Sequence, residues 1–161
     1  MTENPPSMAP SSLPPIAELV PHEGRICLLD RLIAVDVDRL VAEVTVHAAP
    51  SFCRDGAGVG AWVGIEYMAQ AVAAWAGWRA RQAGQEPRIG FLLGTRRYRS
   101  AVPRFLPGQH LEVEIECNYQ ADNGLGHFDC RVREGDLELA TAQITVFGPD
   151  DPNAFLKGDR V

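Results

Sequence analysis

The feature that most constrains the fold is a run of apolar and small residues from Gly60 to Ala83. Its only strongly polar side chains before Arg79 are Glu66 and Gln70. The run predicts one long helix that stops at Gly84, because glycine is favoured just after a helix end. Glu66 and Gln70 are four residues apart and therefore lie on one helix face. A helix this apolar must be covered by other parts of the protein, and an ionisable group on it needs a partner or a task.

A lipid bilayer could also cover such a helix, but Glu66 argues against a membrane span. A charge well inside a membrane helix costs about 2.5–3.5 kcal/mol on insertion scales. No basic loop precedes the segment, although one is common beside a spanning helix. The small residues Gly60, Gly64, Ala69 and Ala73 instead favour close approach of a sheet or of a second copy of the helix.

Composition excludes several classes of protein. A chain of 161 residues is long enough for one domain with its own core. A net charge of -6 argues against non-specific nucleic-acid binding. The four cysteines are widely spaced without a C-x-x-C pair, which argues against a metal site and favours reduced thiols. No secretory signal precedes Ile16, so we expect a cytoplasmic protein.

Apolar runs and alternation of apolar and polar residues predict six strands around the helix. Two strands precede the helix and form a hairpin, and four follow it. Their expected ranges are 26–35, 40–47, 88–99, 110–120, 128–133 and 137–147. Six strands and one apolar helix predict an α+β fold, in which a curved antiparallel sheet wraps around the helix.

The strand at 110–120 alternates strictly. Leu111, Val113, Ile115 and Cys117 are predicted on one face, with Glu112, Glu114, Glu116 and Asn118 on the other, half-exposed face.

Outside the predicted domain at 16–147, the chain has little to bury. Residues 1–15 are rich in proline and serine and predict a disordered tail. Order is expected to begin at Ile16 with a short helical turn, and 148–161 is expected to be a second tail. Exposed sheet edges and the apolar helix indicate that two subunits pair.

Three segments carry a family resemblance. They are Pro21-His22 followed by Leu28-Leu29-Asp30-Arg31; Ile65-Glu66-Tyr67-Met68-Ala69-Gln70; and Arg104-Phe105-Leu106-Pro107-Gly108 leading into Leu111-Glu112-Val113. In order and spacing, across roughly residues 16–147, they resemble the hotdog-fold 3-hydroxyacyl-(acyl carrier protein) dehydratases of fatty-acid synthesis. Residues 62–70 with 91–97 look more like the branch of that family associated with aryl-polyene-type lipid gene clusters.

The resemblance implies a hotdog fold and a dehydration without a cofactor. The substrate would be carried on the phosphopantetheine of an acyl carrier protein. Glu66 would act on the β-hydroxyl, and a histidine from the other subunit would take the α proton. That histidine position is Phe52 here, which cannot accept a proton. His22 is the best replacement within the matched segments, and His47 and Asp55 are further candidates.

Further site residues are predicted around Glu66. Backbone N–H groups of Gly60 and Ala61 would bind the thioester carbonyl, with a role of Gly60 in packing alone as the alternative. Gln70 would orient Glu66 or close the site, although a core hydrogen-bonding role fits equally well. Phe91, Leu92 and Leu93 would line an acyl tunnel by resemblance, with a plain core strand as the alternative.

A basic segment is predicted to dock the acidic carrier protein. Seven arginines fall in one window whose only acid is Glu86: Arg79, Arg81, Arg88, Arg96, Arg97, Arg99 and Arg104. Of these, we expect Arg96, Arg97 and Arg99 to contact the carrier and its phosphate. A solvated strand end with internal salt bridges is the alternative.

The sequence thus predicts a dehydratase that works as a homodimer, or as a heterodimer with another hotdog dehydratase that supplies the histidine. Two alternatives remain open. One is a hotdog acyl thioesterase in which Glu66 activates water, and the other is a non-catalytic subunit that stabilises a dehydratase partner.

Overall fold

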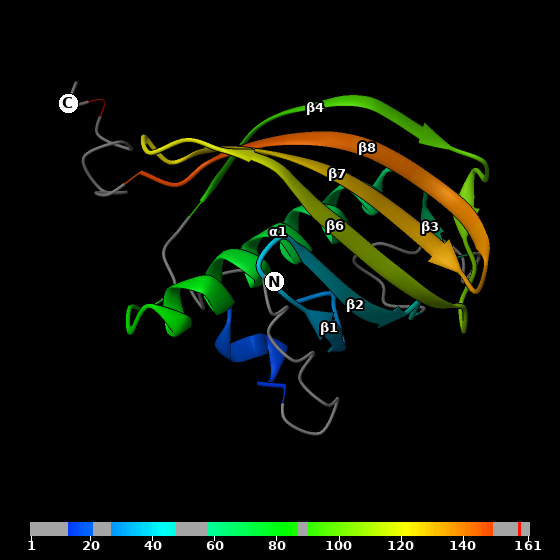
Figure 1. Ribbon diagram of the computed structural model, residues 1–161. Helices are drawn as coiled ribbons and strands as arrows, with labels where there is room; N and C mark the ends of the chain where they lie inside the picture. Colours follow the sequence, from blue (N-terminus) through cyan, green and yellow to red (C-terminus); the bar gives the residue numbers. More distant parts are fainter. Residues whose placement is uncertain (1–12, 21–26, 48–57, 87–89, 150–157, 159–161) are drawn as a thin grey trace, which may run out of the picture.

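A computed structural model describes residues 13–20, 27–47, 58–86, 90–149 and 158. A six-stranded antiparallel sheet, in the order β1-β2-β6-β7-β8-β4, curves around one long helix, α1 (Figure 1). The strands are β1 (Arg31–Val35), β2 (Arg39–Thr45), β4 (Phe91–Ser100), β6 (His110–Gln120), β7 (Leu125–Glu134) and β8 (Leu137–Phe147). The predicted α+β architecture of six strands and one helix is confirmed. The predicted tails, 1–15 and 148–161, lie mostly outside the described residues.

Helix α1 spans Val63–Gln82 and ends as predicted. Gly84 has a φ of 71° and donates its N–H to the carbonyl of Arg81 at 3.0 Å. The N–H of Gln85 donates to the carbonyl of Ala80 at 2.8 Å. These two bonds form a Schellman motif, which satisfies carbonyls that the last turn leaves open.

The helix begins later than the expected Gly60. That glycine belongs to β3 (Val59–Gly60), which pairs with β5 (Arg104–Phe105) in a second, two-stranded sheet. Both strands are two residues long, too short for an alternating pattern to reveal them in the sequence. The first predicted strand is likewise shorter than expected and begins at Arg31 instead of residue 26.

One face of α1 packs into the core. Trp75 is 1% exposed, and its ring meets Phe128 of β7 edge-on with centroids 5.3 Å apart. The Trp75 indole N–H donates to the carbonyl of Asp36 at 3.2 Å, so its polar atom is also satisfied. Within the described ranges, no helix is both long and apolar enough to cross a bilayer.

Near its C-terminal end, α1 rests directly on the chain that precedes β1. A Cβ atom at Gly77 would lie 1.8 Å from the carbonyl oxygen of Leu19, so only glycine permits this approach. Leu19 follows the short 3-10 helix η2 (Ile16–Glu18), the predicted helical turn. Arg81 of α1 holds Glu18 in an ion pair at 2.9 Å.

The opposite stripe of α1 remains partly open. Its residues recur at helical spacing and are Trp62, Glu66, Ala69, Ala73 and Ala76. Trp62, just before the helix, is 62% exposed.

Strand β6 differs from prediction on its polar face. Leu111, Val113 and Ile115 are fully buried, as the alternation indicated. Glu114, however, is only 7% exposed although it points away from α1.

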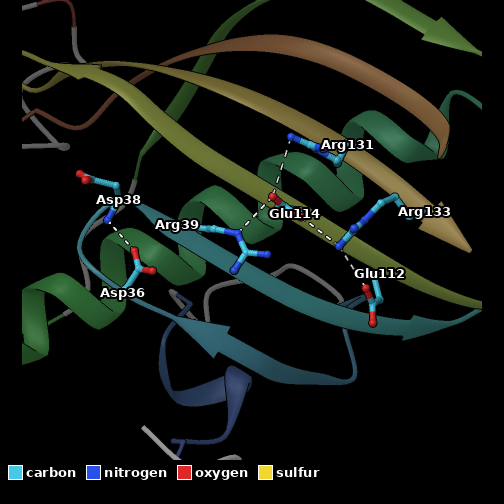
Figure 2. A network of polar contacts seen from close by, with 7 residues as sticks. All are labelled: Asp36, Asp38, Arg39, Glu112, Glu114, Arg131 and Arg133. Atoms are coloured by element: carbon cyan, nitrogen blue, oxygen red, sulfur yellow. Dashed lines mark hydrogen bonds and ion pairs between the residues drawn. The ribbon is translucent and has the colours of Figure 1, made fainter. Parts of the chain in front are cut away.

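Neighbouring strands explain this burial (Figure 2). Arg39 of β2 approaches Glu114 at 3.1 Å, and Arg133 and Arg131 of β7 approach it at 3.0 and 3.9 Å. Arg133 also pairs with Glu112 at 3.2 Å. The long arginine side chains cover the carboxylate, and one strand's own sequence cannot reveal which residues its neighbours contribute.

Strand β4 is an edge of the sheet and is irregular. Its pairing with β8 shifts register between Leu92 and Gly94 and again between Arg96 and Arg99. Within the second shift, Arg97 has a φ of 55° and is the only non-glycine residue with positive φ in the described part of the chain. L-residues rarely adopt this conformation, which costs roughly 1–3 kcal/mol.

Candidate functional site

The polar pair on α1 is connected to the segment before β1. The side-chain oxygen of Gln70 accepts a hydrogen bond from the backbone N–H of Leu28 at 2.7 Å. Its amide nitrogen donates to Glu66 Oε1 at 3.4 Å. Since the Leu28 N–H requires an acceptor, the Gln70 amide must turn its NH2 group toward Glu66. Glu66 itself is half-buried. Gln70 therefore lies where it can orient the Glu66 carboxylate, one of the two roles predicted for it.

Backbone groups before α1 are already engaged. The N–H of Ala61 donates to the carbonyl of Pro103 at 3.0 Å. The carbonyl of Ala61 accepts the N–H of Gly64 at 3.0 Å and also the hydroxyl of Tyr98. Gly60 pairs with Arg104 in the small sheet. Ala61 could therefore bind a substrate carbonyl through its N–H only if its bond to Pro103 opened.

The apolar residues predicted to line a tunnel lie at the start of β4. Phe91 is half-buried, whereas Leu92 and Leu93 are 45% and 54% exposed and therefore do not belong to the core of this subunit.

A cavity of about 690 Å³ lies over β4, β6, β7 and β8. Leu93 and Arg96 contribute to its wall, together with His127 and Asp129 of β7, but Glu66 and Gln70 do not. The chain therefore does not bring the predicted tunnel residues and Glu66 together in that cavity.

The predicted basic segment divides into two groups. Arg79 lies over the Trp75 ring at 5.0 Å, and Arg81 pairs with Glu18. Both arginines therefore make contacts within this subunit near the C-terminal end of α1. The second group consists of Arg96, Arg97, Arg99 and Arg104, all exposed and none in an ion pair with a described residue. We call these four residues the β4–β5 arginines. Arg88 lies outside the described residues.

Several predicted residues cannot be placed. His22, Phe52 and Asp55 lie outside the described residues, and His47 is exposed just after β2. In the part of the chain that the structure describes, no group of three His, Cys, Asp or Glu side chains could hold a metal ion.

Two structural partners of the site were missed by sequence reasoning. Leu28 lies in a segment that carries the family resemblance, but a backbone N–H leaves no trace in a sequence. Tyr98 is recognisable only as one aromatic residue among arginines. Neither the position of Leu28 nor that of Tyr98 in the sequence is specific enough to have predicted the hydrogen bond that the residue makes.

Comparison with known proteins identifies the fold and the family. The family model of the ApeP-like proteins, described as ApeP dehydratase, matches residues 14–157. The dehydratase heterocomplex ApeI:P from Xenorhabdus doucetiae contains a similar chain. It is 27% identical with a TM-score of 0.83, and the match covers 92% of this chain and 99% of that one.

More distant structures share the fold alone. Cj0977, a sigma28-regulated virulence protein of Campylobacter jejuni, is 15% identical with a TM-score of 0.59, over 84% of this chain and 88% of that one. A hypothetical thioesterase with coenzyme A from Streptococcus pneumoniae is 13% identical with a TM-score of 0.57, over 75% and 88%. No curated protein sequence gave a significant match.

These matches confirm the predicted hotdog fold and the predicted relationship to aryl-polyene-type dehydratases. The match extends from just before η2 to beyond β8 and so includes the helix with Glu66 and Gln70. This chain therefore belongs to the ApeP-like family of dehydratases, lyases that remove water from their substrates.

Proposed function

We propose that this chain dehydrates 3-hydroxyacyl thioesters carried on the phosphopantetheine of an acyl carrier protein, in the biosynthesis of polyene lipids. In this reaction a base removes a proton from the carbon next to the thioester. The carbon–oxygen bond of the β-hydroxyl breaks, an acid protonates the departing oxygen, and a double bond forms between the two carbons. The products are one enoyl thioester and one water molecule.

Glu66 is the proposed acid, and its hydrogen bond to Gln70 is the observation that carries the proposal. A catalytic acid needs a fixed orientation and access to substrate. The Leu28–Gln70–Glu66 chain of hydrogen bonds supplies the orientation. The partly open stripe of α1 leaves Glu66 accessible from outside the subunit.

A partner subunit completes the proposed site. Phe52 occupies the family's histidine position, so this chain lacks the expected base there. The similarity to a chain of the ApeI:P dehydratase heterocomplex supports a partner that is itself a hotdog dehydratase. Such a partner would place its histidine opposite Glu66.

The β4–β5 arginines are the proposed docking surface for the carrier protein. Every other described arginine has an acidic partner, an amide or an aromatic ring to contact, whereas these four have no acidic partner among the described residues. Four exposed guanidinium groups within residues 96–104 favour an acidic protein and a phosphate. The positive φ of Arg97 adds support, because an unfavourable backbone conformation is retained most readily where the residue has a task.

Dehydration by the purified complex tests the proposal. The chain is assayed alone and together with its hotdog partner on a 3-hydroxyacyl carrier protein, and the product is identified by its mass. We expect Glu66→Gln to lower the rate of the complex at least ~100-fold, the usual range for a lost acid or base. Glu116→Gln, at an exposed glutamate of β6, is the matched control and should be as active as the wild type.

Phe52→His tests the shared site, because it should give the chain activity in the absence of the partner. A fully active chain alone, unaffected by Phe52→His, would refute the shared site. Release of a free thiol would instead indicate a thioesterase, and an unchanged rate for Glu66→Gln in the complex would indicate a non-catalytic subunit.

A further inference from the structure

The second register shift of β4, between Arg96 and Arg99, determines where the Tyr98 side chain lies. Arg96 pairs with Gln143 and Arg99 with Thr141, so β4 has one more residue than β8 between these pairs. Such a bulge redirects the side chains beside it. Arg97, with its positive φ, is exposed, whereas Tyr98 is half-buried and packs against the core.

The Tyr98 hydroxyl binds the chain just before α1. It donates to the carbonyl of Ala61, which also accepts the N–H of Gly64 in the first turn. A Cβ atom at Gly64 would lie 2.5 Å from the Tyr98 oxygen, so glycine is required for this approach. The helix start is thereby tied to β4 through a close contact, and a methyl group at position 64 would displace the Tyr98 hydroxyl.

Two further contacts tie the same part of the helix to the chain after β4. The N–H of Ala61 donates to the carbonyl of Pro103. Tyr67, the residue after Glu66, meets the ring of Phe105 in β5 with centroids 6.0 Å apart. Glu66 lies about one and a half turns after Ala61, so a rotation or shift at the helix start would move its carboxylate.

We infer that Tyr98 is a positioning residue for the proposed dehydration: its hydrogen bond to the Ala61 carbonyl fixes the start of α1 and thereby the placement of the Glu66 carboxylate. This inference rests on the proposed function, since it assigns to Tyr98 an effect on a reaction at Glu66. Tyr98 also connects this placement to the β4–β5 arginines, because its neighbours in β4 are Arg97, within the bulge, and Arg99, at its end.

Tyr98→Phe tests the inference, because it retains the ring and removes only the hydroxyl. In the full complex with the hotdog partner, we expect kcat to fall about tenfold with KM within about twofold. A small displacement of a catalytic group slows the chemical step, and so lowers kcat, but leaves substrate binding nearly unchanged. Tyr119→Phe removes the same atom from an exposed tyrosine of β6 and should leave both constants unchanged.

Gly64→Ala supplies an independent perturbation of the same contact. The added methyl group should displace the Tyr98 hydroxyl and lower kcat, again with KM nearly constant. Combined with Tyr98→Phe, which removes the atom that the methyl group would meet, Gly64→Ala should cause little further loss. Additive losses would instead show that Gly64→Ala acts independently of the Tyr98 hydroxyl, contrary to the contact described.

The outcomes separate the two proposals. An inactive Glu66→Gln variant beside a Tyr98→Phe variant with wild-type kcat would overturn the inference and leave the proposed function intact. A raised KM with unchanged kcat would also overturn it, because Tyr98 would then act on binding. A fully active Glu66→Gln variant would overturn both. Thermal unfolding of each variant complex should show a folded protein at the assay temperature.

Discussion

Replacing Glu114 by glutamine should destabilise the fold, because it removes the charge that three arginines surround (Figure 2). Breaking a buried ion pair typically costs about 3–5 kcal/mol. The side chains of Arg39 and Arg131 are 41% and 42% exposed, so solvent screens part of their contribution. Glutamine also retains one acceptor oxygen. We therefore expect the free energy of unfolding to fall by about 2 kcal/mol, which lowers the Tm by roughly 4–8 °C for a chain of this size.

The effect should depend on pH in a defined direction. Burial alone would raise the pKa of Glu114, but the hydrogen bond and charge of Arg39, with the charges of Arg131 and Arg133, outweigh burial and hold that pKa below its usual value. A carboxylate with a lowered pKa stabilises the fold above its unfolded pKa, near about 4.3, and loses this contribution as pH falls through the folded pKa. The difference between wild type and Glu114→Gln should therefore be complete at neutral pH and shrink below about pH 4.

Urea unfolding at neutral and at acidic pH measures both quantities. Glu116→Gln, an exposed position on the same strand, should change stability by less than about 0.5 kcal/mol. A Glu114→Gln variant as stable as wild type at neutral pH would refute the argument. So would a difference that persists undiminished in acid.

Three further substitutions test other contacts. Gly77→Ala should cost about 1–3 kcal/mol or prevent folding, because its Cβ would collide with the Leu19 carbonyl; thermal unfolding measures the loss. Arg97→Gly should be about 1 kcal/mol more stable than Arg97→Ala in the same assay, because glycine relieves the positive φ. Gln70→Leu should lower kcat about tenfold through loss of Glu66 orientation, and it leaves the Leu28 N–H without its acceptor at a cost of about 1–3 kcal/mol.

Each of these substitutions has its own check. Gly94→Ala, where a Cβ meets nothing within 4 Å, is the control for Gly77→Ala and should unfold as the wild type does. If Arg97→Ala proved as stable as Arg97→Gly, the backbone strain at this position would be refuted. If Gln70→Leu reduced stability but not kcat, Gln70 would be a core residue and not an orienting one.

The fold was largely predictable because its elements have strong local signals. The polar and apolar residues of β6 alternate without interruption, and its predicted range of 110–120 agrees with the structure. The end of α1 at Gly84 follows from the freedom of glycine to adopt a positive φ. The order of strands in the sheet depends instead on contacts distant in sequence, which no single segment encodes.

The candidate site was predictable only in part. The pairing of Glu66 with Gln70 follows from helical spacing, so the sequence contains it. The link from Gln70 to Leu28 spans 42 residues and uses a backbone N–H, which every residue except proline possesses. Tyr98 acts through a bulge, and its neighbour Arg97 gives no sequence signal for a positive φ, since glycine or asparagine would be the usual residue there.

The two irregularities of β4 also bear on the solubility of the protein. An open sheet edge invites any extended chain to add a further strand, which is a common route to aggregation. On this edge, only Gly94 to Arg96 lies between the two register shifts, so a straight foreign strand finds at most three residues of regular backbone. A strand whose own bends match both irregularities could pair along a greater length. The edge thus discriminates among strands by shape, which protects the protein from unselective pairing in a crowded cell.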